Sequence, residues 1–112
     1  MDCIFCKLAN KEIPTDVVYE DEAVFAFKDG SPQAPSHLLF IPKAHIASVN
    51  EVEDGDHIIS KIFQAIKKVA HEQGFANDGY RVVTNIGQDG GQSVFHLHFH
   101  VMAGRQMNWP AG

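Results

Sequence analysis

The sequence predicts an α+β fold, with one long helix packed on a mostly antiparallel five-stranded sheet. In one long segment, near residues 58–70, apolar side chains recur every three or four positions, as on one face of a helix. Several short runs of β-branched and aromatic residues lie between turn residues, which is typical of strands. Because neighbouring runs are close enough to form hairpins, we expect antiparallel pairing.

Residues that favour turns or interrupt helices divide the first half of the chain into short elements. Pro14 follows the first helical segment, and Pro42 closes the third strand. The predicted elements are a helix at 3–10, strands at 17–20, 23–27 and 37–41, and a loop at 30–35.

The long helix carries the strongest pattern. Asp54 or Asp56 can cap its start, and Gly74 can end it. His57 and His71 are expected on its solvent side. Its apolar stripe consists of Ile58, Ile59, Ile62, Phe63, Ile66, Val69 and Ala70.

Two further strands are predicted after this helix, at 80–85 and 95–102. The tail at 104–112 shows no periodicity, yet it contains Trp109. A tryptophan in an irregular tail needs a surface to pack against, and a second subunit could supply it.

Length and composition exclude several classes of protein. The chain has 112 residues, 45% of them hydrophobic and 21% charged, as in a single globular domain, expected here at 1–112. The longest apolar run is far too short to span a membrane, and the first residues do not resemble a signal peptide. A net charge of −5 argues against non-specific nucleic-acid binding but does not exclude a small anionic ligand. Two cysteines and no export signal favour a reducing cytoplasm.

The segment from His96 to Met102 alternates histidine with apolar residues. Alternate side chains of a strand share a face, so His96, His98 and His100 would lie about 7 Å apart on one side. The intervening Leu97, Phe99 and Val101 would face the core. Three aligned histidines fit either a metal site or acid–base and nucleophilic chemistry near neutral pH.

A glycine-rich loop precedes these histidines. Residues 85–93 contain Gly87, Gly90 and Gly91, whose backbone N–H groups could converge on an anion. The sequence is no P-loop, because the Gly-Lys-Ser/Thr ending is missing. Its position favours a phosphate presented to an imidazole.

These segments resemble the histidine triad superfamily, whose signature alternates histidine with apolar residues as residues 96–102 do. They are most similar to its Hint branch of nucleoside phosphoramidases, including the bacterial type with Cys-x-x-Cys. The dinucleoside polyphosphate hydrolases of the Fhit branch fit less well. Further segments that carry the resemblance are 11–14, 31–37, 90–93, 104–107 and 109–110.

The resemblance implies a hydrolase that cleaves the P–N bond of purine nucleoside 5′-phosphoramidates without a catalytic metal. His98 would attack the α-phosphorus and form a covalent nucleotidyl intermediate. His100 would contact the phosphate or the leaving group, Ser93 would assist the departing amine, and His37 would support the triad. The implied phosphate contacts are Asn85, Gly91, Gln92, Ser93 and the backbone of Val94, together with His98 and His100.

The resemblance also implies how the nucleoside binds. Asp29 would accept both ribose hydroxyls, although a loop aspartate capping Ser31 is the simpler interpretation. Gly30 departs from the branch, which usually has a β-branched apolar residue there, and this implies a looser hold on the base. The implied walls of the purine slot are Phe5, Leu8, Phe27 and Leu39, each of which could equally be core.

A structural zinc site is the remaining prediction. The spacing of Cys3 and Cys6 lets both thiolates reach one zinc ion, with a redox pair or two structural thiols as alternatives. His45 is a candidate third ligand, and the resemblance implies His96 as the fourth. Four protein ligands would make the zinc structural.

The resemblance finally implies a homodimer in which helices and strands of two sheets pair into a larger sheet. Three alternatives remain open. They are a dinucleoside polyphosphate hydrolase or nucleotidyl transferase of the same fold, a nucleotide-binding regulatory protein, and a zinc-binding scaffold.

Overall fold

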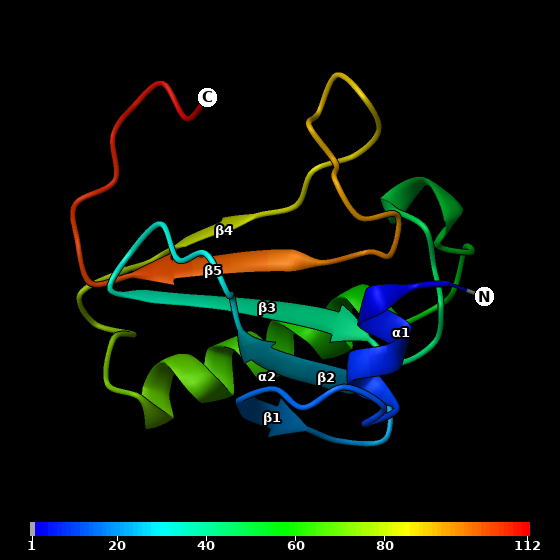
Figure 1. The fold of residues 1–112 in the computed structure, drawn as a ribbon. Coiled ribbons are helices and arrows are strands. Elements are labelled where there is room, and N and C mark those ends of the chain that lie inside the picture. The colour runs from blue at the N-terminus through cyan, green and yellow to red at the C-terminus, as the bar shows by residue number, and fades with distance from the viewer. Residues whose placement is uncertain (1) are drawn as a thin grey trace.

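A five-stranded sheet forms the centre of the fold in a computed structural model that describes residues 2–112 (Figure 1). Every neighbouring pair of strands is antiparallel, in the order β1-β2-β3-β5-β4. The predicted mostly antiparallel, five-stranded sheet is therefore confirmed. The strands are β1 (Val17–Glu20), β2 (Val24–Lys28), β3 (Ser36–Pro42), β4 (Arg81–Val83) and β5 (Phe99–Ala103).

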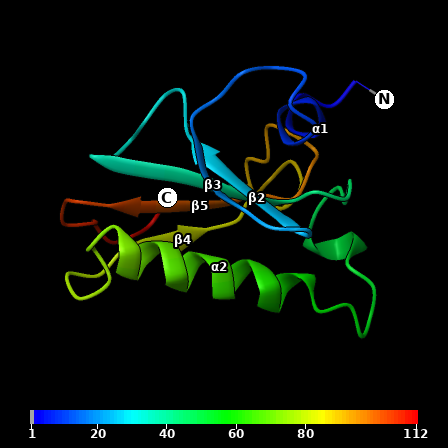
Figure 2. The same ribbon diagram turned by 90° about the horizontal axis from the view of Figure 1, so that it is seen from below.

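The sheet lies between two helices, with the long α2 (Ile58–Glu72) along one face and the short α1 (Ile4–Ala9) on the other (Figure 2). A short 3-10 turn, η1 (Val49–Glu51), follows β3. Two hydrophobic clusters result: a large one under α2 and a smaller one under α1. The α1 side of the sheet carries the polar chemistry described below.

Helix α2 begins and ends where the sequence predicts. Of the two predicted caps, Asp56 is used: its Oδ1 accepts the N–H of Ile58 at 2.9 Å. Gly74 has a φ of 85°, and the N–H of Phe75 turns back to the carbonyl of Ala70 at 3.0 Å. Most of the apolar stripe is buried, but Phe63 stays 44% exposed against the ring of Phe99.

Two strand predictions were too long. The strand predicted at 80–85 is only Arg81–Val83, and the one predicted at 95–102 is Phe99–Ala103. Their shared ladder ends where Val83 faces His100, so the residues before Phe99 have no β4 partner. Leu97 still donates its N–H to the carbonyl of Ile46 at 2.6 Å. His96 and His98 therefore precede the strand that was expected to contain them.

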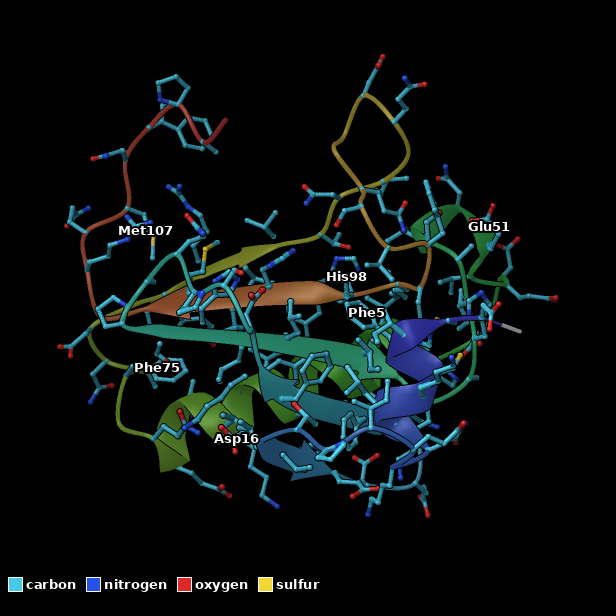
Figure 3. All side chains as sticks on the ribbon, viewed as in Figure 1. Phe5, Asp16, Glu51, Phe75, His98 and Met107 are labelled. Carbon is cyan, nitrogen blue, oxygen red and sulfur yellow. The ribbon has the colours of Figure 1, made fainter. Side chains whose placement is uncertain are left out.

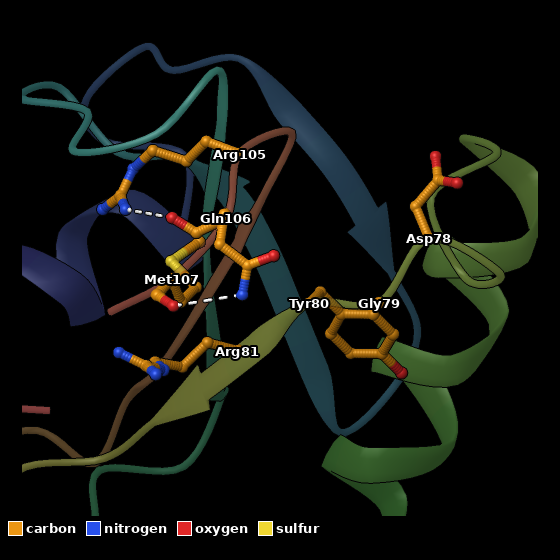
Figure 4. Close-up of a pocket in the computed structure, with 7 residues that line it drawn as sticks. All are labelled: Asp78, Gly79, Tyr80, Arg81, Arg105, Gln106 and Met107. Atoms are coloured by element: carbon orange, nitrogen blue, oxygen red, sulfur yellow. Dashed lines mark hydrogen bonds between the residues drawn. The ribbon is translucent and has the colours of Figure 1, made fainter. Parts of the chain in front are cut away.

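The C-terminal tail leaves the end of β5 and rises away from the sheet, and two arginines anchor it near its start (Figure 1). Arg81 donates to the carbonyl of Asn108 at 2.9 Å, and Arg105 donates to the carbonyl of Gln33 at 3.0 Å. A cavity of about 380 Å³ lies between the start of β4 and the tail, and no histidine lines it (Figure 4). Trp109 is 84% exposed, so little of its side chain is covered by residues 2–112.

Within residues 2–112, no helix combines the length and apolar character needed to cross a membrane.

Candidate active site and metal centre

The hydrogen bonds of His98 fix which of its ring nitrogens is available. Its Nδ1 lies 2.7 Å from the main-chain carbonyl of His96, an acceptor, so Nδ1 carries the hydrogen and donates it. In the neutral ring Nε2 then holds a lone pair. His98 is 4% exposed, and the ring of Phe5 packs edge-on against its imidazole with the ring centroids 5.0 Å apart (Figure 3). The neutral His98 therefore presents an unprotonated nitrogen from a fixed position.

His37 and His100 form a second hydrogen-bonded pair beside it. The backbone N–H of Gln33 donates to Nδ1 of His37 at 2.9 Å, so the hydrogen of the neutral His37 ring is on Nε2. That Nε2 lies 2.9 Å from Nδ1 of His100, which must accept. The neutral His100 therefore keeps its own hydrogen on Nε2. The ring centroids of His98 and His100 are 5.1 Å apart.

Asp29 lies at the end of this pair. Its Oδ1 accepts the N–H of Ser31 at 2.7 Å, which is the simple capping role considered from the sequence. Its Oδ2 lies 3.4 Å from Nε2 of His37 and 3.9 Å from Nδ1 of His100. The carboxylate thus borders the histidine pair with one oxygen and supports its own loop with the other.

The cluster of Asp29, His37 and His100 has the composition of a metal site, but its hydrogen bonds do not fit one. A metal on Nε2 of a neutral His37 would require the hydrogen to move to Nδ1. There it would meet the N–H of Gln33, a donor facing a donor. The donor set therefore favours a proton chain over a metal ligand set at this point.

Burial keeps His100 neutral. Desolvation lowers the pKa of His100 below its ordinary value of 6.5, and the nearby His98 and His37 lower it further. Asp29 opposes this shift only in part. At neutral pH His100 is therefore the uncharged ring that its hydrogen bond with His37 requires.

A separate cluster unites the four predicted metal ligands, Cys3, Cys6, His45 and His96. The four ligand atoms all lie within 4.8 Å of one another. Nδ1 of His96 is 3.3 Å from Sγ of Cys3 and 3.5 Å from Sγ of Cys6, and Nδ1 of His45 is 3.3 Å from Sγ of Cys6. Two thiols and two imidazoles match the preferred ligand set of a closed tetrahedral zinc site.

The tautomer of His96 also suits a metal ligand. Its Nε2 donates to the carbonyl of Pro42 at 2.8 Å, so Nδ1 of the neutral ring carries the lone pair that faces the thiols. Desolvation lowers the pKa of His96, which favours this neutral ring. Desolvation and the neighbouring Cys3 raise the pKa of Cys6. A cation among the thiols would reverse that effect, because it stabilises thiolates.

The side chain of Gln92 makes three hydrogen bonds that organise the glycine-rich loop. Gln92 Oε1 accepts the N–H of Gly87 at 2.9 Å, and its Nε2 donates to the carbonyls of Ala47 and Val94 at 2.7 and 3.1 Å. Its amide is therefore occupied within the protein. Gly91 has a φ of 77°, which suits glycine. At Gly90 a Cβ would lie 2.5 Å from the carbonyl oxygen of Ile86.

The other predicted contacts surround this loop. Asn85 is half-buried two residues after β4, and Ser93 and Val94 line a pocket that also borders Cys3 and His45. The four predicted purine-slot residues lie in the cluster under α1, each less than a tenth exposed. They are Phe5, Leu8, Phe27 and Leu39. Their burial matches the alternative that these side chains belong to the hydrophobic core. Only small parts of each side chain are exposed.

Gln33 was missed by the sequence analysis. It fixes the tautomer of His37 through a main-chain N–H, which any residue except proline offers. The only available signal was its place in the loop that leads to His37.

Comparison with known proteins identifies the family. The HIT domain model matches residues 10–107. The chain is 49% identical to the 14 kDa zinc-binding protein of Zea mays over 112 residues, 97% of this chain and 87% of that protein. It is 42% identical to the purine nucleoside phosphoramidase of Escherichia coli K12 over 107 residues, 95% of this chain and 90% of that protein.

Comparison with solved structures identifies the same family. A HIT family hydrolase from Legionella pneumophila superposes with a TM-score of 0.96 at 50% identity, covering 99% of this chain and 100% of that one. A histidine triad protein from Clostridium difficile superposes with a TM-score of 0.95 at 50% identity, covering 96% of this chain and 95% of that one. The fold and the aligned histidines thus define a histidine triad protein. The chain belongs to the HIT domain family.

Proposed function

We propose that this HIT-type hydrolase is a member of the Hint branch that cleaves the P–N bond of purine nucleoside 5′-phosphoramidates. The observation that carries the proposal is the donation from Nδ1 of His98 to the carbonyl of His96, at 2.7 Å. This leaves Nε2 of His98 free to act as a nucleophile. The neighbouring His100 ring carries its hydrogen on Nε2. Similarity to the phosphoramidase of Escherichia coli supports the same chemistry.

The reaction has two displacements. Nε2 of His98 attacks the α-phosphorus, the P–N bond breaks, and the amine leaves with a proton. Water then attacks the phosphorus of this adduct, and the bond between phosphorus and Nε2 of His98 breaks. The nucleoside monophosphate is released and the imidazole is restored. The Nε2 hydrogen of His100 donates to a phosphate oxygen or is transferred to the leaving nitrogen, and in the second displacement the attacking water returns a proton to Nε2 of His100. His37 keeps its own hydrogen and orients His100, because its Nε2–H donates to Nδ1 of His100 at 2.9 Å.

The glycine-rich loop holds the phosphate, and the ends of β2 and α1 hold the nucleoside. Asn85 contributes its side chain and Val94 its main-chain N–H. Gly91 and Gln92 act by shaping the loop, because their N–H groups donate to the carbonyls of Gln88 and Gly87 and the Gln92 amide is also occupied. Ser93 assists the leaving amine. Asp29 binds the ribose hydroxyls with the carboxylate that also borders His37. The small exposed edges of Phe5, Leu8, Phe27 and Leu39 form the floor of the base site.

The metal site is structural. Cys3, Cys6, His45 and His96 would hold one zinc ion with no position left for water or substrate. When bound, the ion supplies a crosslink between α1, the segment after β3 and the segment before β5. A curated relative is named a zinc-binding protein, which supports this assignment.

The proposal also covers the oligomeric state of the protein and its cellular compartment. Residues 1–112 form one domain, and two copies pair through the edge strand β4 and through α2, whose Phe63 is 44% exposed. Neither the thiol of Cys3 nor that of Cys6 is in a disulfide, which fits a reducing cytoplasm. Size-exclusion chromatography with light scattering tests the dimer directly.

The deciding experiment compares hydrolysis of a fluorogenic adenosine 5′-phosphoramidate with hydrolysis of a diadenosine polyphosphate, each with and without a chelator. We expect fast phosphoramidate turnover that survives chelation. Preference for the polyphosphate would favour the dinucleoside hydrolase. Nucleotide binding without turnover would favour the regulatory protein, and activity lost to the chelator would contradict a purely structural zinc.

A further inference from the structure

Thr84 makes a hydrogen bond that the strand pattern does not require. The ladder between β4 and β5 ends with Val83 opposite His100. Continued by two residues, the same register would place Asn85 opposite His98. At this point the donor to the main-chain carbonyl of His98 is instead the side-chain hydroxyl of Thr84, at 2.8 Å.

This hydroxyl holds the main chain of His98 beyond the end of the ladder. The imidazole of His98 is tied to the carbonyl of His96, and the carbonyl of His98 is tied to Thr84. Both ends of the residue are therefore fixed, which limits rotation of the ring. His98 is 4% exposed, so an unpaired carbonyl here would be poorly solvated and the segment would move to satisfy it.

The same hydrogen bond affects Asn85. In an antiparallel ladder the His98 carbonyl would normally take a main-chain N–H from the opposite strand. Because a side chain takes that place, β4 ends before Asn85, and Asn85 turns into the glycine-rich loop. The hydroxyl of residue 84 therefore has two effects. It fixes the main chain of His98, and it leaves Asn85 outside the β4–β5 ladder.

We propose that Thr84 is a positioning residue: it fixes the main chain of His98 for attack and keeps Asn85 available to the phosphate. This inference rests on the proposed function, since it assumes that His98 is the nucleophile. A Thr84 that only stabilised the fold would affect unfolding and leave the rate of attack unchanged.

The test uses two variants of opposite design. Thr84→Val keeps the shape and removes the hydroxyl, whereas Thr84→Ser keeps the hydroxyl and removes the methyl group. Rapid-quench mass spectrometry follows formation of the nucleotidyl–His98 adduct from adenosine 5′-phosphoramidate in a single turnover. We expect Thr84→Val to slow adduct formation roughly tenfold to hundredfold, the scale expected when a reacting group is misplaced by about 1 Å. Thr84→Ser should restore most of the rate.

The NMR spectrum provides a readout that a purely structural role of Thr84 would not change. In Thr84→Val the ring resonances of His98 and the amide of Asn85 should shift or broaden at a temperature well below unfolding, and in Thr84→Ser they should match the wild type. Equal rates and spectra for Thr84→Val and the wild type would overturn the inference. Equal losses in both variants would also overturn it, because packing of the methyl group would then be responsible.

Failure of the proposed function is recognisable separately. If the wild-type protein forms no adduct, the reaction assigned to His98 is wrong, whatever Thr84 does. The NMR comparison then still decides whether the hydroxyl positions the His98 segment, because it needs no substrate.

Discussion

The main-chain carbonyl of His96 accepts the Nδ1 hydrogen of His98 at 2.7 Å. The same residue directs its own Nδ1 toward Cys3 and Cys6 and its Nε2 toward Pro42. One residue therefore connects the candidate metal centre to the candidate nucleophile, through its side chain on one side and its carbonyl on the other. Removing the side-chain partners of His96 leaves this carbonyl in place, which separates the two roles in the tests below.

Replacing His98 with alanine should abolish turnover while nucleotide binding persists. The other contacts to phosphate and ribose remain, but no nitrogen is left to form the adduct, so we expect at least a roughly thousandfold loss of kcat. Steady-state hydrolysis and calorimetric binding of AMP measure the two effects. His71→Ala is the matched control, because His71 is exposed on α2, where its ring donates to the carbonyl of Lys67 in the same helix. Retained turnover in His98→Ala would remove His98 as the nucleophile.

The period of two in residues 96–102 predicted which side chains share a face, even though only part of the segment is a strand. Leu97, Phe99 and Val101 do pack in the cluster under α2, and His96 and His98 both contact Phe5 of α1. The alternation survives because extended backbone keeps its pleat without a ladder partner. Strand length was mispredicted because propensity does not reveal where cross-strand hydrogen bonds stop.

The sequence could not predict the main-chain contacts that set the histidine tautomers. The tautomers of His37, His96 and His98 are set by an N–H or carbonyl of Gln33, Pro42 and His96. Side-chain identity does not encode these contacts, since nearly every residue carries the same main-chain groups. The sequence could nominate the histidines but could not say which nitrogen of each would be available.

Replacing Cys3 and Cys6 with serine should remove the metal and lower stability. Sγ of Cys3 accepts the N–H of Cys6 at the start of α1, and a serine hydroxyl also caps helices, so the cap should survive. We expect zinc content to fall close to zero and the melting temperature to drop by about 5 °C or more, with most turnover retained. Elemental analysis and thermal unfolding measure both. The chelated wild type is the control, and unchanged zinc content would contradict the site.

The lowered pKa of His100 predicts loss of stability in acid. Below its ordinary value of 6.5 the unfolded chain binds the proton first, so the free energy of unfolding falls as pH drops from 6.5 toward the lower folded-state pKa of His100. Above 6.5 this contribution is fully present. Urea unfolding of the wild type and of His100→Gln between pH 7.5 and 5 isolates the effect, since glutamine can still accept from His37. Identical pH dependence in the two proteins would show that His100 does not contribute.

The same protonation should reduce activity. A charged His100 would direct an Nδ1 hydrogen at the Nε2 hydrogen of His37, and the 2.9 Å hydrogen bond would break. The acid limb of kcat should therefore lie below pH 6.5. A limb centred above that value would assign it to another group.

Gly90→Ala should disrupt the glycine-rich loop. Its Cβ would lie 2.5 Å from the carbonyl oxygen and 2.8 Å from the nitrogen of Ile86, so the loop must shift. Such overpacking costs about 1–3 kcal/mol, and displacement of the loop should raise the KM for nucleotide substrates several-fold. Asp89→Ala, an exposed change in the same loop, is the control. If both variants bind nucleotide as the wild type does, the loop does not hold the phosphate.

Gly30→Val should tighten nucleotide binding. A Cβ at Gly30 would meet nothing within 4 Å, and the backbone there does not need the left-handed region, so a β-branched residue can be accommodated. It would supply the β-branched apolar side chain that the resemblance to the Hint branch implies after Asp29, the proposed ribose ligand. Partial burial against a base contributes about 1 kcal/mol, which corresponds to a roughly fivefold lower KM with kcat unchanged. Gly30→Ala should give a smaller decrease, because it adds less apolar surface. Kinetics with adenosine and uridine phosphoramidates measure the effect, and an equal or higher KM in Gly30→Val would place the base away from residue 30.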